Sequence, residues 1–272
     1  MSFDAVGKTS LLVAAARAVE TKRSESEGRL FTDPFAEALA GGEGFSILQQ
    51  SRAEVGEQPS IALRTRSFDD RIGQALAGGV RQIVIPAAGM DARAYRLSFP
   101  AGARVFELDR PEVLSYKQER LGETLPRCVR RAVGVDLRGE WQAELIRAGM
   151  NTAERTLWLV EGLLVYLDEA AVLTLLEKID SLSVPNSILL FDVLGRSLLD
   201  APFMAKQLRF IERLGAPWRF GTDEPEKLVE KFGWTAVATE PAEVDAARWR
   251  FPAAPRHVPG VPRIFFVEAR KL

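Results

Sequence analysis

The sequence predicts an α/β protein built on a Rossmann-like, doubly wound sheet of seven strands with a helical layer before it. After Gly79, short runs rich in Val, Ile and Leu alternate with longer amphipathic segments. Strands buried on both faces are apolar throughout, and right-handed helical crossovers join parallel strands, so this alternation indicates a mostly parallel sheet. The last two strands are separated by a proline-rich loop instead of a helix, which indicates an antiparallel C-terminal hairpin at one edge.

Three helices are expected before the sheet. The first covers the alanine-rich residues 11–19. The second begins at Asp33 and Pro34, with Asp33 as N-cap and Pro34 at the first helical position. We expect the glycine-rich residues 41–44 to end it. The third covers residues 60–76 and stops at a pair of glycines.

The sheet elements follow in order. Strands are expected at residues 82–86, 103–108, 128–135, 156–160, 187–193, 235–239 and 263–269. Helices are expected at residues 111–123, 140–148, 169–182, 198–214 and 225–232. A length of 272 residues suits one elaborated domain. We therefore expect a single domain, with the helical layer over residues 1–80, the core over residues 81–272 and a lid insertion at about residues 196–221.

The composition excludes several classes of function. The 36 basic and 37 acidic residues leave a net charge of −1, which gives no electrostatic reason to expect a nucleic acid or a membrane as partner. The lone Cys128 and the lone His257 exclude an internal disulfide and a Cys/His zinc cluster, so no metal is expected. No stretch reaches the roughly 18 apolar residues that a membrane helix needs. We expect a reducing, cytoplasmic location.

The turn after the first strand is the first candidate site. Its small residues Ala87, Ala88 and Gly89 would let the backbone approach a ligand, and Asp91 suits the N-cap of the next helix. The turn lacks the G-x-G-x-x-G pattern, which disfavours an NAD-dependent oxidoreductase. A plain tight turn is the alternative.

Acidic residues occur where the next three strands end. Asp109 follows the second strand, where a doubly wound sheet binds a ribose, and Glu107 is the second choice. After the third strand, Asp136 could accept from an adenine amino group while Leu137 packs on the ring. Glu161 interrupts an apolar stretch after the fourth strand and needs a partner such as a cationic amino group. Solvent-facing acids and helix caps are the alternatives.

One basic residue of the third helix suits a ligand. Arg64 would face the crevice and could bind a carboxylate through two hydrogen bonds. Arg66, two residues further on, has Asp69 or Asp70 as an ion-pair partner.

Aromatic side chains mark a candidate acceptor pocket. Tyr166 follows Glu161 by five residues and would lie at the rim of the crevice, with a core position as the alternative. In the insertion, Phe203 and Trp218 suit a small apolar acceptor. Packing within a lid or a contact between two copies of the chain would also explain these aromatic residues. The sequence therefore does not distinguish a monomer from a homodimer.

Five stretches of the chain carry a family resemblance. They are Arg-Thr-Arg-Ser-Phe-Asp-Asp at residues 64–70 and the segments at residues 88–97, 106–114, 135–138 and 161–167. Together they resemble the leucine carboxyl methyltransferase-like family of class I S-adenosylmethionine (SAM) methyltransferases, and more narrowly its bacterial O-methyltransferase branch.

The resemblance implies SAM as the cofactor and a role for each candidate residue. Arg64, assisted by Arg17, would bind the methionine carboxylate, and Ala87 and Gly89 would belong to the loop beneath the methionine. Asp109 would bind the ribose, Asp136 and Leu137 would contact the adenine, and Glu161 would be a further acidic contact.

One position departs from the family pattern, because Ala87 stands where the family usually has glycine. We expect Ala87 to have a negative φ. A SAM-fold binding or scaffold protein that methylates nothing is therefore the second hypothesis.

The implied reaction is methyl transfer from SAM to an oxygen of a small-molecule acceptor. A carboxylate is ionised near neutral pH and needs no general base, whereas a phenol needs one, for which His257 is the candidate. Carboxyl and hydroxyl methylation both stay open, and no catalytic residue is named.

Overall fold

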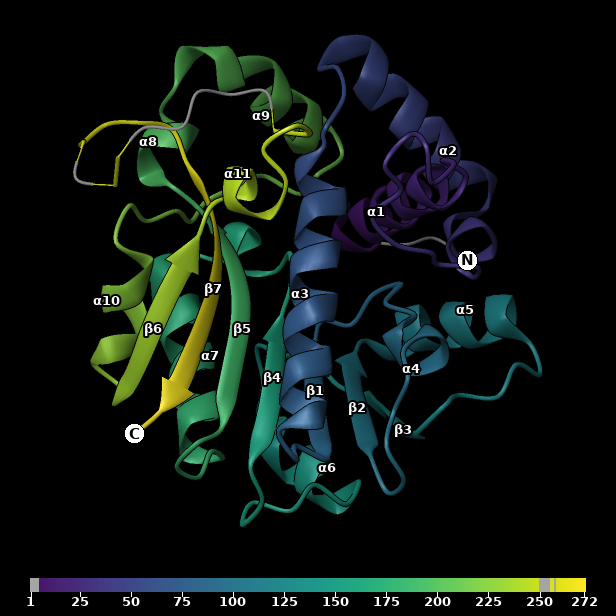
Figure 1. Ribbon diagram of the computed structural model, residues 1–272, viewed down its shortest axis with the longest axis vertical. Helices are drawn as coiled ribbons and strands as arrows, with labels where there is room; N and C mark the ends of the chain where they lie inside the picture. The colour runs from purple at the N-terminus through teal and green to yellow at the C-terminus, as the bar shows by residue number, and fades with distance from the viewer. Residues whose placement is uncertain (1–4, 250–254, 257) are drawn as a thin grey trace.

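A computed structural model of the protein describes residues 5–249, 255–256 and 258–272. It contains a seven-stranded sheet with the strand order β3-β2-β1-β4-β5-β7-β6 (Figure 1). The strands are β1 (Gln82–Pro86), β2 (Arg104–Asp109), β3 (Val129–Gly134), β4 (Thr156–Val160), β5 (Ile188–Leu194), β6 (Trp234–Thr239) and β7 (Ile264–Lys271). All pairings among β1 to β5 are parallel, and β7 is antiparallel to both β5 and β6. The predicted fold is confirmed, and every strand lies within two residues of its predicted position.

The central strands explain why the sequence pattern was clear. Every residue of β1, β4 and β5 is buried, so these strands are apolar runs without alternation. The predicted antiparallel hairpin is confirmed at one edge of the sheet. Within it, strand β7 lies between β5 and β6, and β6 forms the edge.

Helices cover the sheet and extend past one end of it. They are α1 (Ala5–Thr21), α2 (Ala36–Glu54), α3 (Ser60–Ala77), α4 (Arg93–Arg96), α5 (Pro111–Leu121), α6 (Gln142–Arg147), α7 (Glu169–Ser181), α8 (Arg196–Leu199), α9 (Ala205–Arg213), α10 (Pro225–Glu230) and α11 (Pro241–Val244). In Figure 1, α3 lies in front of the sheet, and α1, α2, α8 and α9 lie beyond the carboxyl ends of the parallel strands. The Phe68 ring of α3 packs edge-on against Phe266 of β7, with the ring centroids 6.0 Å apart.

Helix α2 consists of two helical segments that meet at a kink. Gly41 has the non-helical values φ 56° and ψ −175°, so the first segment ends there as predicted, and a second segment continues to Glu54. A Cβ atom on Gly44 would lie 2.6 Å from the carbonyl oxygen of Leu11, so this glycine lets the second segment pack directly against α1. Gly41 therefore ends a helical segment, whereas Gly44 serves tertiary packing.

Three further details differ from the predicted helices. The side chain of Asp33 accepts a hydrogen bond from the Phe35 N–H at 3.2 Å, but the helix begins only at Ala36. The single helix expected at residues 198–214 is divided into α8, the short 3-10 helix Pro202–Met204 and α9. A four-residue helix, α11, lies in the connection between β6 and β7.

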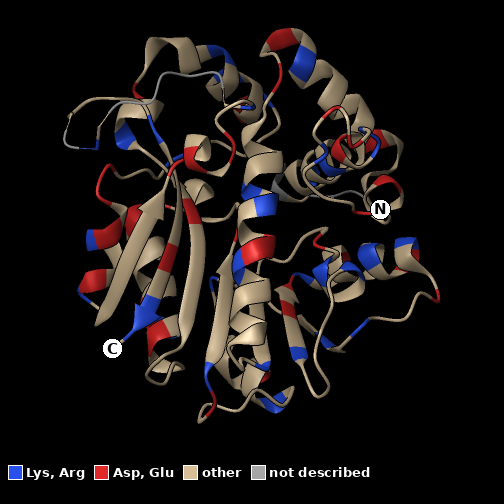
Figure 2. Ribbon diagram, in the orientation of Figure 1, with Lys and Arg blue, Asp and Glu red and all other residues tan. Residues whose placement is uncertain are grey.

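The charged residues show no separation into large areas of one sign. Figure 2 shows acidic and basic segments interspersed along the helices and loops. Within the described part of the chain, no helix combines the length and the apolar character needed to cross a membrane.

Candidate functional site

A cavity of about 990 Å³ opens at the carboxyl ends of the parallel strands. The ten residues expected to contact the cofactor or the acceptor line it: Arg64, Ala87, Gly89, Asp109, Asp136, Leu137, Glu161, Tyr166, Phe203 and Trp218. We divide its lining in two. The strand-end half consists of Arg64, the strand ends and the loops that follow them. The helical half consists of α1, residues 55–61, Tyr166 and the insertion at residues 198–219.

The turn after β1 has the backbone that glycine would give it. Ala87 has φ 54°, so the expectation of a negative φ is wrong. Alanine in this left-handed region costs roughly 1–2 kcal/mol, which the surrounding structure must supply. Gly89 also has a positive φ of 46°, and a Cβ atom on it would approach the Ser10 side chain of α1 to 2.9 Å. The turn therefore keeps its shape despite the alanine, and α1 closes over it.

Asp109 is tied to this turn through its carboxylate. The Gly89 N–H donates to Oδ2 at 2.7 Å and the Arg110 N–H donates to Oδ1 at 2.8 Å. Burial raises the pKa of Asp109, and the two N–H donors oppose that rise only in part. The alternative, Glu107, is fully buried, pairs with Lys117 at 2.8 Å and does not line the cavity.

Arg64 joins two acids from different strand ends. Its Nε donates to Glu161 at 2.9 Å, and its Nη1 donates to Asp192 of β5 at 2.7 Å. Burial lowers the pKa of Arg64, but Asp192 and Glu161 outweigh burial and raise it overall. Asp192 also accepts the Gly162 N–H at 2.6 Å. Among the described residues, nothing accepts a hydrogen bond from Arg64 Nη2.

Asp192 was missed by sequence reasoning. It lies inside the continuous apolar run of β5, and its partner Arg64 is 128 residues away. An acid within a fully buried strand was the available signal, because such an acid needs a partner.

The ion pairs continue from Glu161 through the helix after the turn. Arg93 Nη1 lies 2.8 Å from Glu161, and its Nε donates to Asp69 at 2.7 Å. Asp91 pairs with Arg93 as well, while Ala92 and not Asp91 is the N-cap of α4. Burial alone would raise the pKa of both Asp91 and Glu161, but nearby arginines outweigh it. The pKa of Asp91 is lowered mainly by Arg93, and the pKa of Glu161 is lowered by Arg93 and, to a smaller extent, by Arg64.

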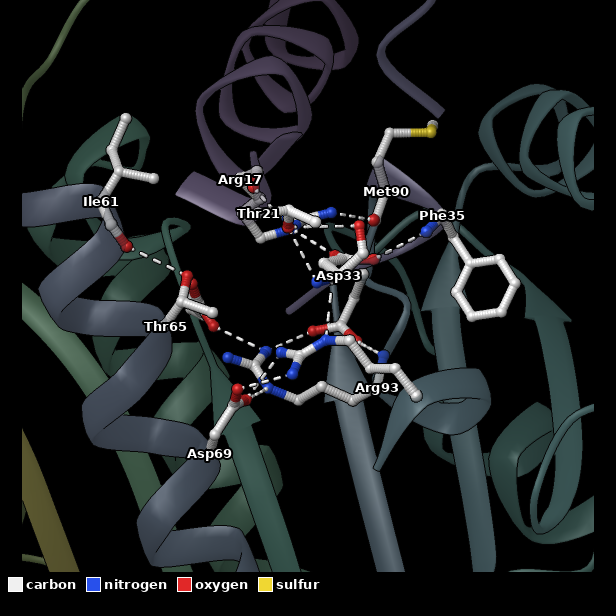
Figure 3. A network of polar contacts seen from close by, with 12 residues as sticks. Arg17, Thr21, Asp33, Phe35, Ile61, Thr65, Asp69, Met90 and Arg93 are labelled. Atoms are coloured by element: carbon white, nitrogen blue, oxygen red, sulfur yellow. Dashed lines mark hydrogen bonds and ion pairs between the residues drawn. The ribbon is translucent and has the colours of Figure 1, made fainter. Parts of the chain in front are cut away.

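A second branch fixes α1 to the turn. Arg17 Nε donates to Asp33 at 2.9 Å and its Nη2 donates to the carbonyl of Met90 at 2.5 Å. Figure 3 shows Arg17 and Asp33 beside Asp69 and Arg93. Arg17 therefore holds the loop: its hydrogen bonds go to Asp33 and to Met90, whereas Arg64, which it was expected to assist, bonds to other acids. Arg66 pairs with Asp70 at 2.7 Å, as predicted.

The adenine candidates lie at the rim of the strand-end half. Asp136 is partly exposed, and hydrogen bonds from the Arg138 side chain and backbone lower its pKa to about 2. Leu137 packs against the buried cluster behind β3 and β4. Asp136 thus meets a ligand only at the solvent boundary.

The helical half is mainly apolar. Tyr166 and Trp218 are half-buried and pack against the buried cluster to which Phe210 and Ile211 of α9 belong, whereas Phe203 is 58% exposed. His257, the candidate base, lies outside the described residues. Within residues 5–249, 255–256 and 258–272, no three His, Cys, Asp or Glu side chains gather in a way that could hold a metal ion.

Solved structures define the class of fold. A methyltransferase from Thermobifida fusca superposes with a TM-score of 0.62 at 20% identity, covering 86% of this chain and 92% of that chain. A DUF574 family protein from Streptomyces avermitilis has a TM-score of 0.62 at 14% identity, covering 95% of this chain and 97% of that chain. The protein therefore has the fold of a Rossmann-like methyltransferase.

Sequence comparison identifies the family. The profile of the leucine carboxyl methyltransferase family matches residues 10–180. A Parafrankia protein assigned as an S-adenosyl-L-methionine-dependent methyltransferase is 40% identical over 270 residues, covering 89% of this chain and 84% of that protein. A similarly assigned Mycobacterium tuberculosis protein is 40% identical over 261 residues, covering 88% and 79%. The chain belongs to the leucine carboxyl methyltransferase family.

Proposed function

We propose that the protein is a SAM-dependent O-methyltransferase that methylates a carboxylate or hydroxyl oxygen of a small-molecule acceptor. One observation carries the proposal. The candidate cofactor residues and the apolar helical half line one continuous cavity, so two ligands can lie in contact within it. Family membership and the assignments of the relatives support SAM as the methyl donor.

The strand-end half fits the charged parts of SAM. Arg64 Nη2 is available for a carboxylate, although its other nitrogens are occupied. Glu161 Oε1 accepts from Arg64 and Oε2 lies 2.8 Å from Arg93 Nη1, so this carboxylate is held ionised at the cavity wall, where it would attract an ammonium group. A Cβ atom on Gly162 would lie 3.3 Å from Arg64 Nη2, and the glycine therefore keeps the approach to this nitrogen open.

The same half fits the nucleoside. Each oxygen of Asp109 accepts one backbone N–H and keeps lone pairs for the ribose hydroxyls. Asp136 and Leu137 would hold the adenine at the rim. When bound, SAM supplies an electrophilic methyl group.

The protein's contribution is then to bind and orient. Holding two reactants in a near-attack arrangement can supply on the order of 7–11 kcal/mol. Among the described residues, no histidine, lysine or cysteine lines the cavity. This favours an acceptor oxygen that is already ionised, such as a carboxylate, because it needs no general base. We further propose that the insertion at residues 196–221 acts as the lid over the acceptor.

Calorimetric titration with SAM and with its demethylated product tests the proposal. We expect both to bind in the micromolar range. An absence of binding at millimolar SAM would favour the alternative of a scaffold protein, for which Ala87 gives the motive.

A further inference from the structure

The helical half contains one deeply buried side-chain amide, that of Gln207. Gln207 of α9 is only 5% exposed, yet it lines the cavity. Its Oε1 accepts a hydrogen bond from Gln58 Nε2 at 2.9 Å. Gln58 Nε2 also donates to Ser51 Oγ at 2.9 Å, and Ser51 is 1% exposed. This chain of hydrogen bonds fixes which end of the Gln207 amide faces the protein.

The other end of the amide lacks a partner. Within the described part of the chain, no acceptor bonds to Gln207 Nε2. It is not among the occluded polar atoms, so its remaining surface opens on the cavity that Gln207 lines. An amide N–H₂ that stays unpaired in an apolar enclosure costs free energy, which a ligand oxygen would recover.

A second donor in the same half also lacks a partner but is occluded. The indole Nε1 of Trp218 is buried and has no hydrogen-bond partner among the described residues. Trp218 and Gln207 both line the cavity on the side of the insertion. Of these two donors, Gln207 Nε2 is therefore the one that an acceptor molecule could reach.

Charge decides which kind of oxygen suits this wall. Arg219 lines the cavity beside Trp218 but is exposed to solvent, and the buried Arg263 pairs with Glu240 and donates to the Pro255 carbonyl at 2.8 Å. A carboxylate placed against Gln207 would thus lie in an apolar enclosure without a cation of its own. A neutral carbonyl or ester oxygen needs only the N–H donors.

Building on the proposed function, we propose that Gln207 is a specificity residue, which binds a neutral oxygen on the end of the acceptor remote from the methylated group. Gln58 is its positioning residue. The acceptor is therefore an apolar molecule with a carbonyl-type oxygen at its far end.

Three carboxylic acids of equal chain length test this. All three have a carboxylate at one end and differ at the other. That far end is an apolar methyl group in octanoate, a neutral ester in monomethyl suberate and a second carboxylate in suberate. Each is titrated by calorimetry into the wild type, Gln207→Met and Gln58→Met, with and without the demethylated cofactor. Gln50→Met, a change at an exposed residue of α2, is the matched control.

We expect Gln207→Met to lower the affinity for monomethyl suberate about two- to tenfold, the effect of one lost hydrogen bond. The affinity for octanoate should change by less than about twofold. Gln58→Met should give a smaller effect of the same kind, and Gln50→Met none. Suberate should bind the wild type most weakly. Equal weakening of octanoate and the ester, tightest binding of suberate, or no binding of any acid at millimolar concentration would overturn the proposal.

A SAM titration of the same variants separates the two proposals. Gln207→Met should keep the wild-type affinity for SAM. A wild type that binds the acids in the expected order but not SAM would contradict the proposed function and leave the role of Gln207 standing.

Discussion

The two halves of the cavity are held together by different interactions. In the strand-end half, charged side chains fix one another: Arg64 bridges Glu161 and Asp192, and Arg93 continues the chain to Asp69. In the helical half, apolar contacts dominate around α9, where the buried polar group Gln207 is neutral, while the buried Arg17 of α1 pairs with Asp33. A substitution in the strand-end half uncovers a buried charge, whereas one around α9 changes shape and at most a hydrogen bond.

Arg64→Met tests this comparison most strongly. It would leave Glu161 and Asp192 buried without their shared cation, so we expect a loss of about 3–5 kcal/mol in the free energy of unfolding and a SAM affinity at least about 100-fold weaker. Arg66→Met is the control on the same helix, where an exposed pair with Asp70 should contribute at most about 1 kcal/mol. Urea unfolding and calorimetry measure both. Similar effects of the two variants would show that the charged half is not held together by its ion pairs.

Two acids of the strand-end half should differ from each other. Asp109 is buried and Asp136 is partly exposed and held by Arg138. Asp109→Asn should lower the affinity for SAM about 10- to 100-fold, the range expected when hydrogen bonds to a charged group are lost. Asp136→Asn should change the affinity about threefold or less, because solvent competes at the rim. Calorimetry decides the order, and a larger effect at Asp136 would reverse our assignment of the ribose contact.

The ion pairs of the strand-end half should also make the stability of the folded protein depend on pH in the acidic range. The pKa of Asp91 is lowered in the folded protein despite its burial, chiefly by Arg93. Its contribution is therefore present above the ordinary aspartate pKa of about 3.9 and is lost as the pH falls toward the lower folded value. Asp91→Asn should lower stability by about 1–3 kcal/mol at neutral pH and flatten the decline below about pH 4. Unfolding free energies measured from neutral pH downward test this, and parallel curves for variant and wild type would contradict it.

The smallest expected effect concerns backbone strain in the turn. Ala87→Gly should raise the unfolding free energy by up to about 1 kcal/mol, because glycine adopts positive φ without strain. The neighbouring Ala88 is buried and does not have positive φ, so Ala88→Gly should lower stability by about 0.5–1 kcal/mol. Opposite signs in thermal unfolding would confirm the strain at Ala87. Two losses would mean that the methyl group of Ala87 contributes more through packing than its backbone costs.

The sequence predicted the sheet well because β1, β4 and β5 are buried throughout and read as uninterrupted apolar runs. It failed where a residue's role depends on a distant partner. The second segment of α2 was not predicted, because the contact of Gly44 with Leu11 that places it is tertiary. Asp192 and Arg93 were missed for the same reason, since Asp192 pairs with Arg64 and Arg93 pairs with Glu161, each far away in the sequence. Asp109 was found because its position at a strand end is a local property of the fold.

The place of β7 in the sheet has a consequence for how the protein is made. Strand β6 pairs only with β7 in the described sheet, and β7 also supplies the antiparallel partner of β5. Until residues 264–271 have left the ribosome, β5 presents an open, apolar edge and β6 has no strand beside it. Open edges of this kind pair readily with other chains. The nascent protein should therefore depend most on chaperones during synthesis of the stretch between β6 and β7.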